Sequence, residues 1–302
     1  MYKKYILIKL LLLLFSTPLL AWINITDDSG RQIRLEQPAK RIVSLAPHIT
    51  ENLFRIGAGR TLVAVVEYSD YPLVATQIER VGSFNKVDLE RVAELKPDLV
   101  VAWGEGTPAH QLSRLEQLGI KVLRESPRSF NDIAASLTRL GSATGFELNA
   151  RRQVSQMEQR LGVLRRRYRD ASPVKLFYQL WQQPLITLNR QQLIHQMIEL
   201  CGAVNPFADR IEMAPRIGLE GVVEANPDLI VAGLQKRKRR IGIDENWRNY
   251  WAPWHQITAV REDLLFSIPA DLTHRPTMRA LDGVEQMCKM VDQARSTLAV
   301  RH

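Results

Sequence analysis

Apolar residues recur along the chain at helical spacing in some segments and as short continuous runs in others. In residues 89–102, Leu89, Val92 and Leu95 follow helical spacing, and a Pro-Asp pair then opens an apolar run. The same pattern returns 130 residues later in residues 219–232, with nine of the fourteen positions identical. Each copy predicts a helix, a tight turn and a buried strand. A repeated αβ unit at this distance indicates two similarly built halves, each with a mostly parallel sheet.

The rest of the first half alternates in the same way. Residues 22–35 alternate in polarity around Asp28-Ser29-Gly30, which predicts a short hairpin. Buried strands are predicted over residues 41–46, 61–66 and 121–124, with helical segments between them. This order is typical of an open parallel sheet with helices on its faces.

One long helix is predicted between the halves. Its apolar positions step by three and four residues from Val154 through Met157, Leu161 and Leu164 to Tyr168. A helix of this size is about 30 Å long, so it can run along both halves and join them as a stiff strut. Such a linker predicts small motions between the halves and not a wide hinge closure.

The fold class that follows is α/β, with two lobes that each hold a mostly parallel sheet flanked by helices and are joined by one long α-helix. The predicted boundaries are a signal peptide over residues 1–21, an N-terminal lobe over 22–146, the linking helix over 147–171 and a C-terminal lobe over 172–302. Two lobes create a cleft between them.

The first 21 residues have the composition of a secretory signal. Lys3, Lys4 and Lys9 precede an apolar run over residues 10–20, and Ala21 is a small residue suited to cleavage. The cut has no cysteine, so no lipid anchor of the lipoprotein type is expected, and the periplasm is the predicted location. Removal of the three lysines lowers the net charge from +9 to +6.

Composition and missing motifs exclude several function classes. The basic patches at Arg165–Arg169 and residues 236–240 suggest nucleic acid, but no RNA-binding motif or zinc-finger spacing accompanies them. The chain has no G-x-S-x-G elbow, phosphate loop or dinucleotide fingerprint, so we expect a protein that is not an enzyme. Its six histidines form no tight cluster with acids, which argues against a site for a bare metal ion.

The chain has two cysteines, Cys201 and Cys288. In an oxidising compartment an isolated pair favours a disulfide, here within the second lobe. The alternative is two buried small apolar side chains.

Candidate ligand contacts follow from the rule that open α/β sheets bind ligands beyond the carboxyl ends of their strands. Tyr68 and Tyr71 follow the predicted strand at 61–66, and Trp103 directly follows the strand of the first repeat. Trp181 follows a predicted strand at 176–180, and Asp271 follows one at 264–269. Aromatic side chains at these places suit a large, flat, partly apolar ligand. For any one of them, packing in the core is the alternative.

The repeat also places two acids one helical turn apart in each lobe, Glu90 with Glu94 and Glu220 with Glu224. An ordinary solvated helix face is one explanation. Recurrence on both lobes favours a second one, in which each half presents an acidic knob to a partner.

Together these segments carry a family resemblance. RIVSLAPHITENLFRIG, EYSDYP, LERVAELKPDLVVAW, the long helix and the second repeat resemble the substrate-binding proteins of ABC importers whose lobes are joined by one long helix. That group serves ferric siderophores, haem and cobalamin, and the resemblance covers essentially all of the mature chain. YSDYP, the AW after the first repeat and the cysteine pair are similar to its cobalamin-binding members.

The resemblance implies a monomeric periplasmic receptor that captures cobalamin (vitamin B12) in the cleft, without a cofactor. It adds Phe84 to the aromatic contacts and makes Asp271 and Arg275 a polar pair of the site. It also implies that Glu90 and Glu220 dock onto arginines of a permease dimer with its ATPase subunits.

Some features depart from the cobalamin-binding pattern. Ala214 stands where that pattern has a tryptophan, and residues 236–240 look like an insertion that could hold an anionic ligand. A ferric siderophore or haem, with Tyr68 or His48 as axial ligand, is therefore the alternative. A periplasmic scavenger that works without a transporter is a further one.

Overall fold

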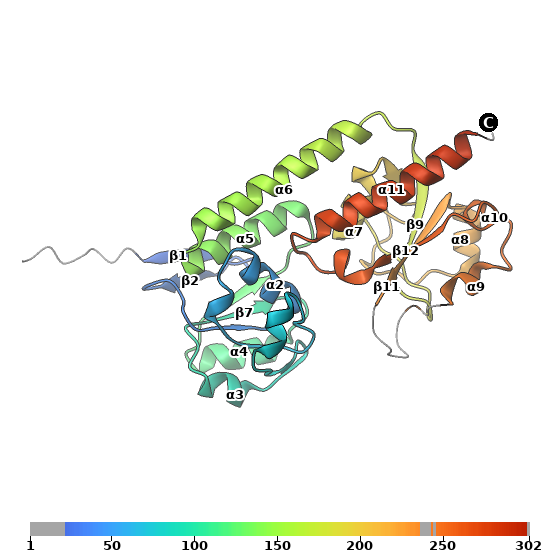
Figure 1. Cartoon of the computed structure of the whole chain (residues 1–302). Helices are drawn as coiled ribbons and strands as arrows, with labels where there is room; N and C mark the ends of the chain where they lie inside the picture. Colours follow the sequence, from blue (N-terminus) through green and yellow to red (C-terminus); the bar gives the residue numbers. More distant parts are fainter. Residues whose placement is uncertain (1–21, 236–242, 244–245, 301–302) are drawn as a thin grey trace, which may run out of the picture.

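Two parallel four-stranded sheets, one in each lobe, organise the chain (Figure 1). The computed structural model describes residues 22–235, 243 and 246–300. The predicted signal peptide over residues 1–21 and the basic run over residues 236–240 lie outside the described residues. The predicted α/β class with two lobes is confirmed.

The N-terminal lobe begins with the predicted hairpin, β1 (Ile23–Thr26) and β2 (Gln32–Leu35), whose turn holds Gly30 at a φ of 81°. Its parallel sheet has the order β4-β3-β7-β8, and a small hairpin of β5 and β6 lies beside it. The strands are β3 (Ile42–Ser44), β4 (Leu62–Val65), β5 (Gly82–Ser83), β6 (Lys86–Val87), β7 (Leu99–Trp103) and β8 (Val122–Glu125). The helices are α2 (Pro47–Arg55), α3 (Leu89–Glu94), α4 (Ala109–Gln117) and α5 (Phe130–Thr144).

The C-terminal lobe has a second parallel sheet, in the order β10-β9-β11-β12. Its central strands are apolar on both faces because helices cover the sheet on both sides. The strands are β9 (Val174–Gln179), β10 (Ala203–Val204), β11 (Leu229–Leu234) and β12 (Leu265–Pro269). The helices are α7 (Leu193–Leu200), α8 (Leu219–Ala225), α9 (Trp247–Trp251), α10 (Thr258–Arg261) and α11 (Ala280–Ala299), and the short 3-10 turn η4 (Ala270–Leu272) follows β12.

The sequence repeat has the same structural role in both lobes. Each copy forms a short helix, α3 or α8, followed by a buried strand, β7 or β11. The aspartate of the Pro-Asp pair fixes the neighbouring strand: Asp98 Oδ2 accepts the backbone N–H of Arg41 at 2.9 Å, and Asp228 Oδ2 accepts that of Lys175 at 2.7 Å. Both copies of the repeat therefore join a helix and a buried strand to the strand beside it.

The predicted strut is α6 (Glu147–Tyr168), which extends from one lobe to the other above α5 and α11 (Figure 1). Gly145, with a φ of 76°, ends α5 in the left-handed conformation that allows the chain to turn into α6. Met157, Leu161, Leu164 and Tyr168 are buried as predicted. They belong to one continuous apolar core that includes strands of both sheets, so the lobes are packed together and not merely tethered.

The disulfide is confirmed: Cys201 at the end of α7 is bonded to Cys288 in α11. Both cysteines are buried in the core that the lobes share.

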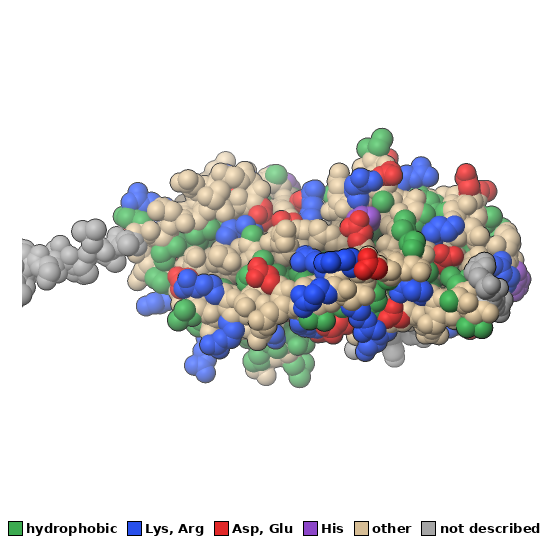
Figure 2. All heavy atoms as spheres, turned by 90° about the horizontal axis from the view of Figure 1, so that it is seen from above, with side chains coloured by type: hydrophobic (Ala, Val, Ile, Leu, Met, Phe, Trp, Pro, Cys, Tyr) green, Lys and Arg blue, Asp and Glu red, His purple; other side chains and the backbone are tan. Residues whose placement is uncertain are grey.

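The face seen from above, along α6, carries interspersed charges of both signs (Figure 2). Arg160 of α6 pairs with Asp282 and Glu285 of α11, and Arg167 pairs with Asp292. Two of the six arginines of α6 are thus paired with acids of the adjacent helix.

Candidate ligand-binding site

Phe84 and Trp103 of the N-terminal lobe lie in contact beyond the ends of its strands. Phe84 sits at the tip of the β5–β6 hairpin, and Trp103 is the last residue of β7. Their ring centroids are 5.6 Å apart, and both side chains are partly exposed. The structure therefore brings these two predicted ligand contacts together.

His48, at the start of α2, also packs against Trp103, edge-on with the ring centroids 5.9 Å apart. It is only 6% exposed, and its Nε2 has no hydrogen-bond partner among the described residues. Burial and the nearby charge of Arg275 lower the pKa of His48 to about 3, so the imidazole is neutral at physiological pH. The side chain that packs against Trp103 is thus a neutral imidazole.

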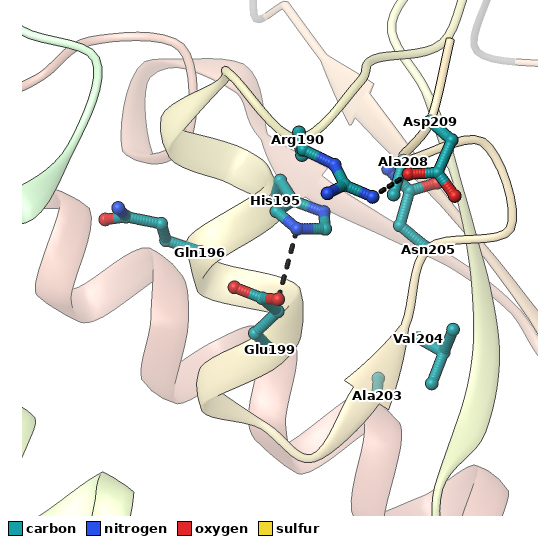
Figure 3. Close-up of a pocket in the computed structure, with 9 residues that line it drawn as sticks. All are labelled: Arg190, His195, Gln196, Glu199, Ala203, Val204, Asn205, Ala208 and Asp209. Atoms are coloured by element: carbon teal, nitrogen blue, oxygen red, sulfur yellow. Dashed lines mark ion pairs between the residues drawn. The ribbon is translucent and has the colours of Figure 1, made fainter.

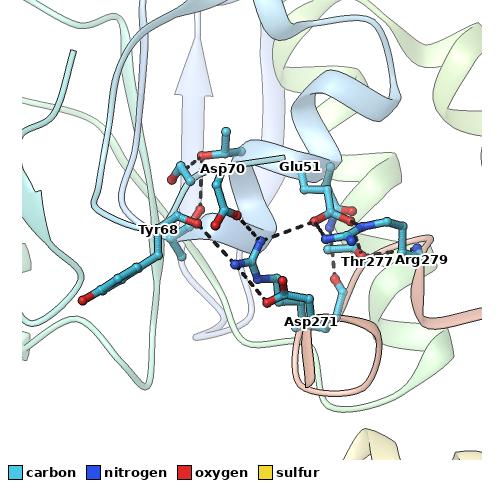
Figure 4. A network of polar contacts seen from close by, with 12 residues as sticks. Glu51, Tyr68, Asp70, Asp271, Thr277 and Arg279 are labelled. Carbon is cyan, nitrogen blue, oxygen red and sulfur yellow. Dashed lines mark hydrogen bonds and ion pairs between the residues drawn. The ribbon is translucent and has the colours of Figure 1, made fainter. Parts of the chain in front are cut away.

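Tyr68 occupies a strained turn after β4. Its φ of 69° lies in the left-handed region, which costs a non-glycine residue about 1–3 kcal/mol. Its carbonyl accepts the Asp70 N–H at 3.0 Å and Arg275 Nη2 at 3.3 Å. Figure 4 shows the Tyr68 side chain extending away from these polar contacts. The surrounding hydrogen bonds therefore hold Tyr68 in a backbone conformation that a non-glycine residue seldom adopts.

Asp271 and Arg275, the predicted polar pair, bind each other in the C-terminal lobe, and Arg275 reaches across to this turn. Arg275 Nη2 lies 3.1 Å from Asp271 Oδ1, and Arg275 Nη1 lies 2.9 Å from Asp70 Oδ1. The Arg275 side chain is 14% exposed. The structure therefore places Arg275 at the junction of the lobes with its charge already paired.

Glu51 of α2 is the buried centre of this network, and sequence reasoning missed its role (Figure 4). Its carboxylate accepts hydrogen bonds of 2.6 Å from Thr277 Oγ1, Arg279 Nε and Arg279 Nη2, all from the C-terminal lobe. The sequence carries no local signal for this role, because Glu51 stands between Ile49 and Leu53 as a surface acid of an amphipathic helix also can. A buried carboxylate needs cationic partners, and among the described residues those of Glu51, Arg275 and Arg279, both come from the opposite lobe.

Trp181 stands apart from the other predicted contacts. It follows β9, is partly exposed, and its Nε1 donates to the carbonyl of Gln183 at 3.1 Å. Its backbone pairs with Ile186. Among the described residues no recorded contact joins Trp181 to Phe84 or Trp103. Its recorded contacts lie within the C-terminal lobe, so the structure does not bring it together with the aromatic pair.

Comparison with known proteins places this architecture in a family. The sequence profile described as "periplasmic binding protein" matches residues 42–272. The chain is 37% identical over 251 residues to the vitamin B12-binding protein of Vibrio cholerae, covering 83% of this chain and 88% of that protein. The chain belongs to the periplasmic binding protein family. Families of this kind bind ligands and are not enzymes, as expected from the motifs.

Solved structures agree with this assignment. The crystal structure of the periplasmic vitamin B12 binding protein of Vibrio cholerae superposes with a TM-score of 0.76 at 35% identity, covering 85% of this periplasmic binding protein and 98% of the other chain. A periplasmic heme-binding protein from Roseiflexus sp. RS-1 superposes with a TM-score of 0.74 at 19% identity, covering 85% and 99%. The second likeness shows only the fold.

The recurrent acids of this periplasmic binding protein differ between the lobes. Glu90 and Glu220 are exposed in the first turns of α3 and α8. In the first copy Arg91 Nη1 binds Glu94 at 2.8 Å, whereas Gly221 occupies the equivalent position in the second copy. In the first copy Arg91 therefore pairs with Glu94, and the structure records no ion pair between Arg91 and Glu90.

A separate cavity of about 520 Å³ lies in the C-terminal lobe, between α7 and the loop after β10 (Figure 3). His195 pairs with Glu199 at 3.2 Å, and Arg190 pairs with Asp209. None of the predicted ligand contacts lines it. These polar side chains are paired with one another, so we assign the cavity no part in the ligand site.

The described residues also lack two features. They contain no group of three or more His, Cys, Asp or Glu side chains arranged to hold a metal ion. Within residues 22–235, 243 and 246–300, no helix has the length and apolar character needed to cross a membrane.

Proposed function

We propose that this protein captures vitamin B12 between its two lobes and delivers it to an ABC importer. The observation that carries the proposal is the 37% identity to a vitamin B12-binding protein over 83% of the chain. The contact of Phe84 with Trp103 supports it, because a corrinoid is a large flat ligand that partly exposed aromatic rings can hold.

We propose further that the ligand lies between aromatic side chains of both lobes. Tyr68, Phe84 and Trp103 supply the wall of the N-terminal lobe, and Trp181 supplies that of the C-terminal lobe. Asp271 and Arg275 orient the polar groups of the ligand, and the position of Arg275 at the junction of the lobes supports this role.

The partner of such a receptor is the permease of the transporter. We propose that Glu90 and Glu220 dock onto arginines of the two permease subunits, which act with their ATPase subunits, while Glu94 and Glu224 support the contact. Both primary acids are exposed, one on each lobe, and paired charges of this kind set register and association rate more than affinity. The receptor acts as a monomer without binding nucleic acid.

We propose a periplasmic location, as for the relative whose crystal structure is described as periplasmic. Residues 1–21 would be removed during export, without attachment of a lipid. The mature chain would comprise lobes over residues 22–146 and 172–302 and a linking helix over 147–171.

Calorimetric titration of the exported, purified protein with cyanocobalamin tests the ligand. We expect tight binding of one cobalamin per chain, weakened at least tenfold by Trp103→Ala. Trp22→Ala is the matched control, because the structure records this ring against Arg34 of β2 and against none of the predicted ligand contacts, so the affinity should be unchanged. Binding of haemin or a ferric siderophore in place of cobalamin would preserve the transport role and overturn the ligand.

A further inference from the structure

The buried carboxylate of Glu51 is 4% exposed, so a bound ligand has little of it to contact. Every hydrogen bond that the structure records to this carboxylate comes from residues more than 220 positions away, with separations of 226 and 228. Asn52, the next residue, donates to the Pro276 carbonyl at 3.2 Å and adds a further link between the lobes. Glu51 therefore binds the loop between η4 and α11 to the N-terminal lobe.

The two arginines that Glu51 gathers both contact the segment that carries Tyr68 and Tyr71. Arg275 Nη1 lies 3.9 Å from Glu51, and the same guanidinium binds the Tyr68 carbonyl and the Asp70 carboxylate. Arg279 binds Glu51 through two nitrogens. Its guanidinium carbon lies 3.9 Å from the centroid of the Tyr71 ring, in the geometry of a cation–π contact.

The segment needs this support because Tyr68 is held in the left-handed region. A non-glycine residue remains there only when its surroundings determine the conformation. Arg80 contributes from the same lobe by donating to the Ser69 carbonyl at 2.9 Å. The arginines of the opposite lobe complete the support, and Glu51 holds them in place.

We infer that Glu51 is a positioning residue of the ligand site: through Arg275 and Arg279 it fixes the segment that presents Tyr68, and thereby sets the affinity for the ligand without touching it. This inference rests on the proposed function only for the identity of the ligand. It predicts that the ligand site is assembled by a contact between the lobes and not by the N-terminal lobe alone.

A double-mutant cycle tests the inference, with cyanocobalamin affinity measured by calorimetry. Glu51→Gln keeps the size of the side chain and removes its charge, and should weaken binding about tenfold, or about 1.4 kcal/mol. The same substitution should weaken binding about tenfold in a Trp181→Ala background, because Trp181 does not contact the network. In a Tyr68→Ala background it should weaken binding threefold or less, because the residue that Glu51 positions is already gone.

Glu285→Gln is the matched control. Glu285 also accepts a hydrogen bond from an arginine Nε, that of Arg160 at 2.9 Å, and joins two helices on the face of α6. The cobalamin affinity of Glu285→Gln should equal that of the wild type. If Glu51→Gln does not fold, Thr277→Val removes a single hydrogen bond to the same carboxylate without changing side-chain size, and should show the same dependence on Tyr68 on a smaller scale.

Unchanged affinity in Glu51→Gln, or an equal loss in the Tyr68→Ala and Trp181→Ala backgrounds, would overturn the positioning role. Failure of the proposed ligand is distinguishable, because the wild type itself would then not bind cobalamin. The cycle is in that case measured with whichever of haemin or a ferric siderophore the wild type binds, with the same expected pattern.

Discussion

Removal of the disulfide should cost stability without changing ligand affinity. Cys201 and Cys288 are 87 residues apart in sequence. A crosslink of that separation restricts the unfolded chain by about 4.6 kcal/mol on the chain-entropy model. The paired variant Cys201→Ala with Cys288→Ala should lose this amount, because alanine in place of two buried cysteines leaves the rest of the shared core unchanged.

Urea unfolding followed by far-UV circular dichroism measures this loss. With a denaturant slope of about 3 kcal/mol per molar, the midpoint should fall by about 1.5 M. A reducing agent should lower the wild-type midpoint to that of the variant and leave the variant unaffected, which separates the crosslink from the packing of the side chains. Equal midpoints for the variant and the oxidised wild type would refute the reasoning. Cobalamin affinity should be equal in the two proteins, because no predicted ligand contact touches the disulfide.

Three further predictions concern charge. Glu51→Ala should lower the free energy of unfolding by about 3 kcal/mol, because it leaves the partly buried guanidinium of Arg279 without its carboxylate partner, whereas Glu285→Ala, which breaks a partly exposed pair, should cost about 1 kcal/mol or less in the same urea titrations. His48 has a folded pKa of about 3, below its usual value of about 6.5. The contribution of the neutral His48 imidazole to the free energy of unfolding is therefore complete above pH 6.5 and is lost as pH falls through that value. At pH 5 the wild type should have lost about 2 kcal/mol of its free energy of unfolding through this group, whereas His48→Gln should show no such loss. Reversal of charge at Glu90 and Glu220 should abolish cobalamin uptake by cells while calorimetric affinity stays unchanged; normal uptake would indicate a scavenger that works without the transporter.

Local patterns in the sequence were enough to predict the architecture. The repeat predicted two parallel sheets because its spacing and its Pro-Asp pair act within a few residues, and Asp98 and Asp228 indeed bind the adjacent strands in the same way. The stripe from Val154 to Tyr168 predicted α6 for the same reason, since apolar spacing along a helix is read over four residues at a time.

The arrangement of the ligand site depended on contacts that sequence spacing does not encode. Tyr68, Trp103 and Asp271 could be placed beyond strand ends, but not beside particular neighbours. The bond between Arg275 and Asp70 joins residues 205 positions apart, and it exists because α6 and the shared core set the lobes at one spacing.

Buried charge was the feature that sequence alone concealed. In the sequence, Glu51 has the same appearance as an exposed acid on a surface helix, because a charged residue type says nothing about where its partner lies. Only the packed lobes show that its carboxylate is enclosed and bound to Arg279. Helix and strand periodicity, which arises from neighbouring residues, was therefore determined by the sequence itself, whereas the network around Glu51 was decided by tertiary structure, since a buried ion pair forms only where distant segments meet away from water.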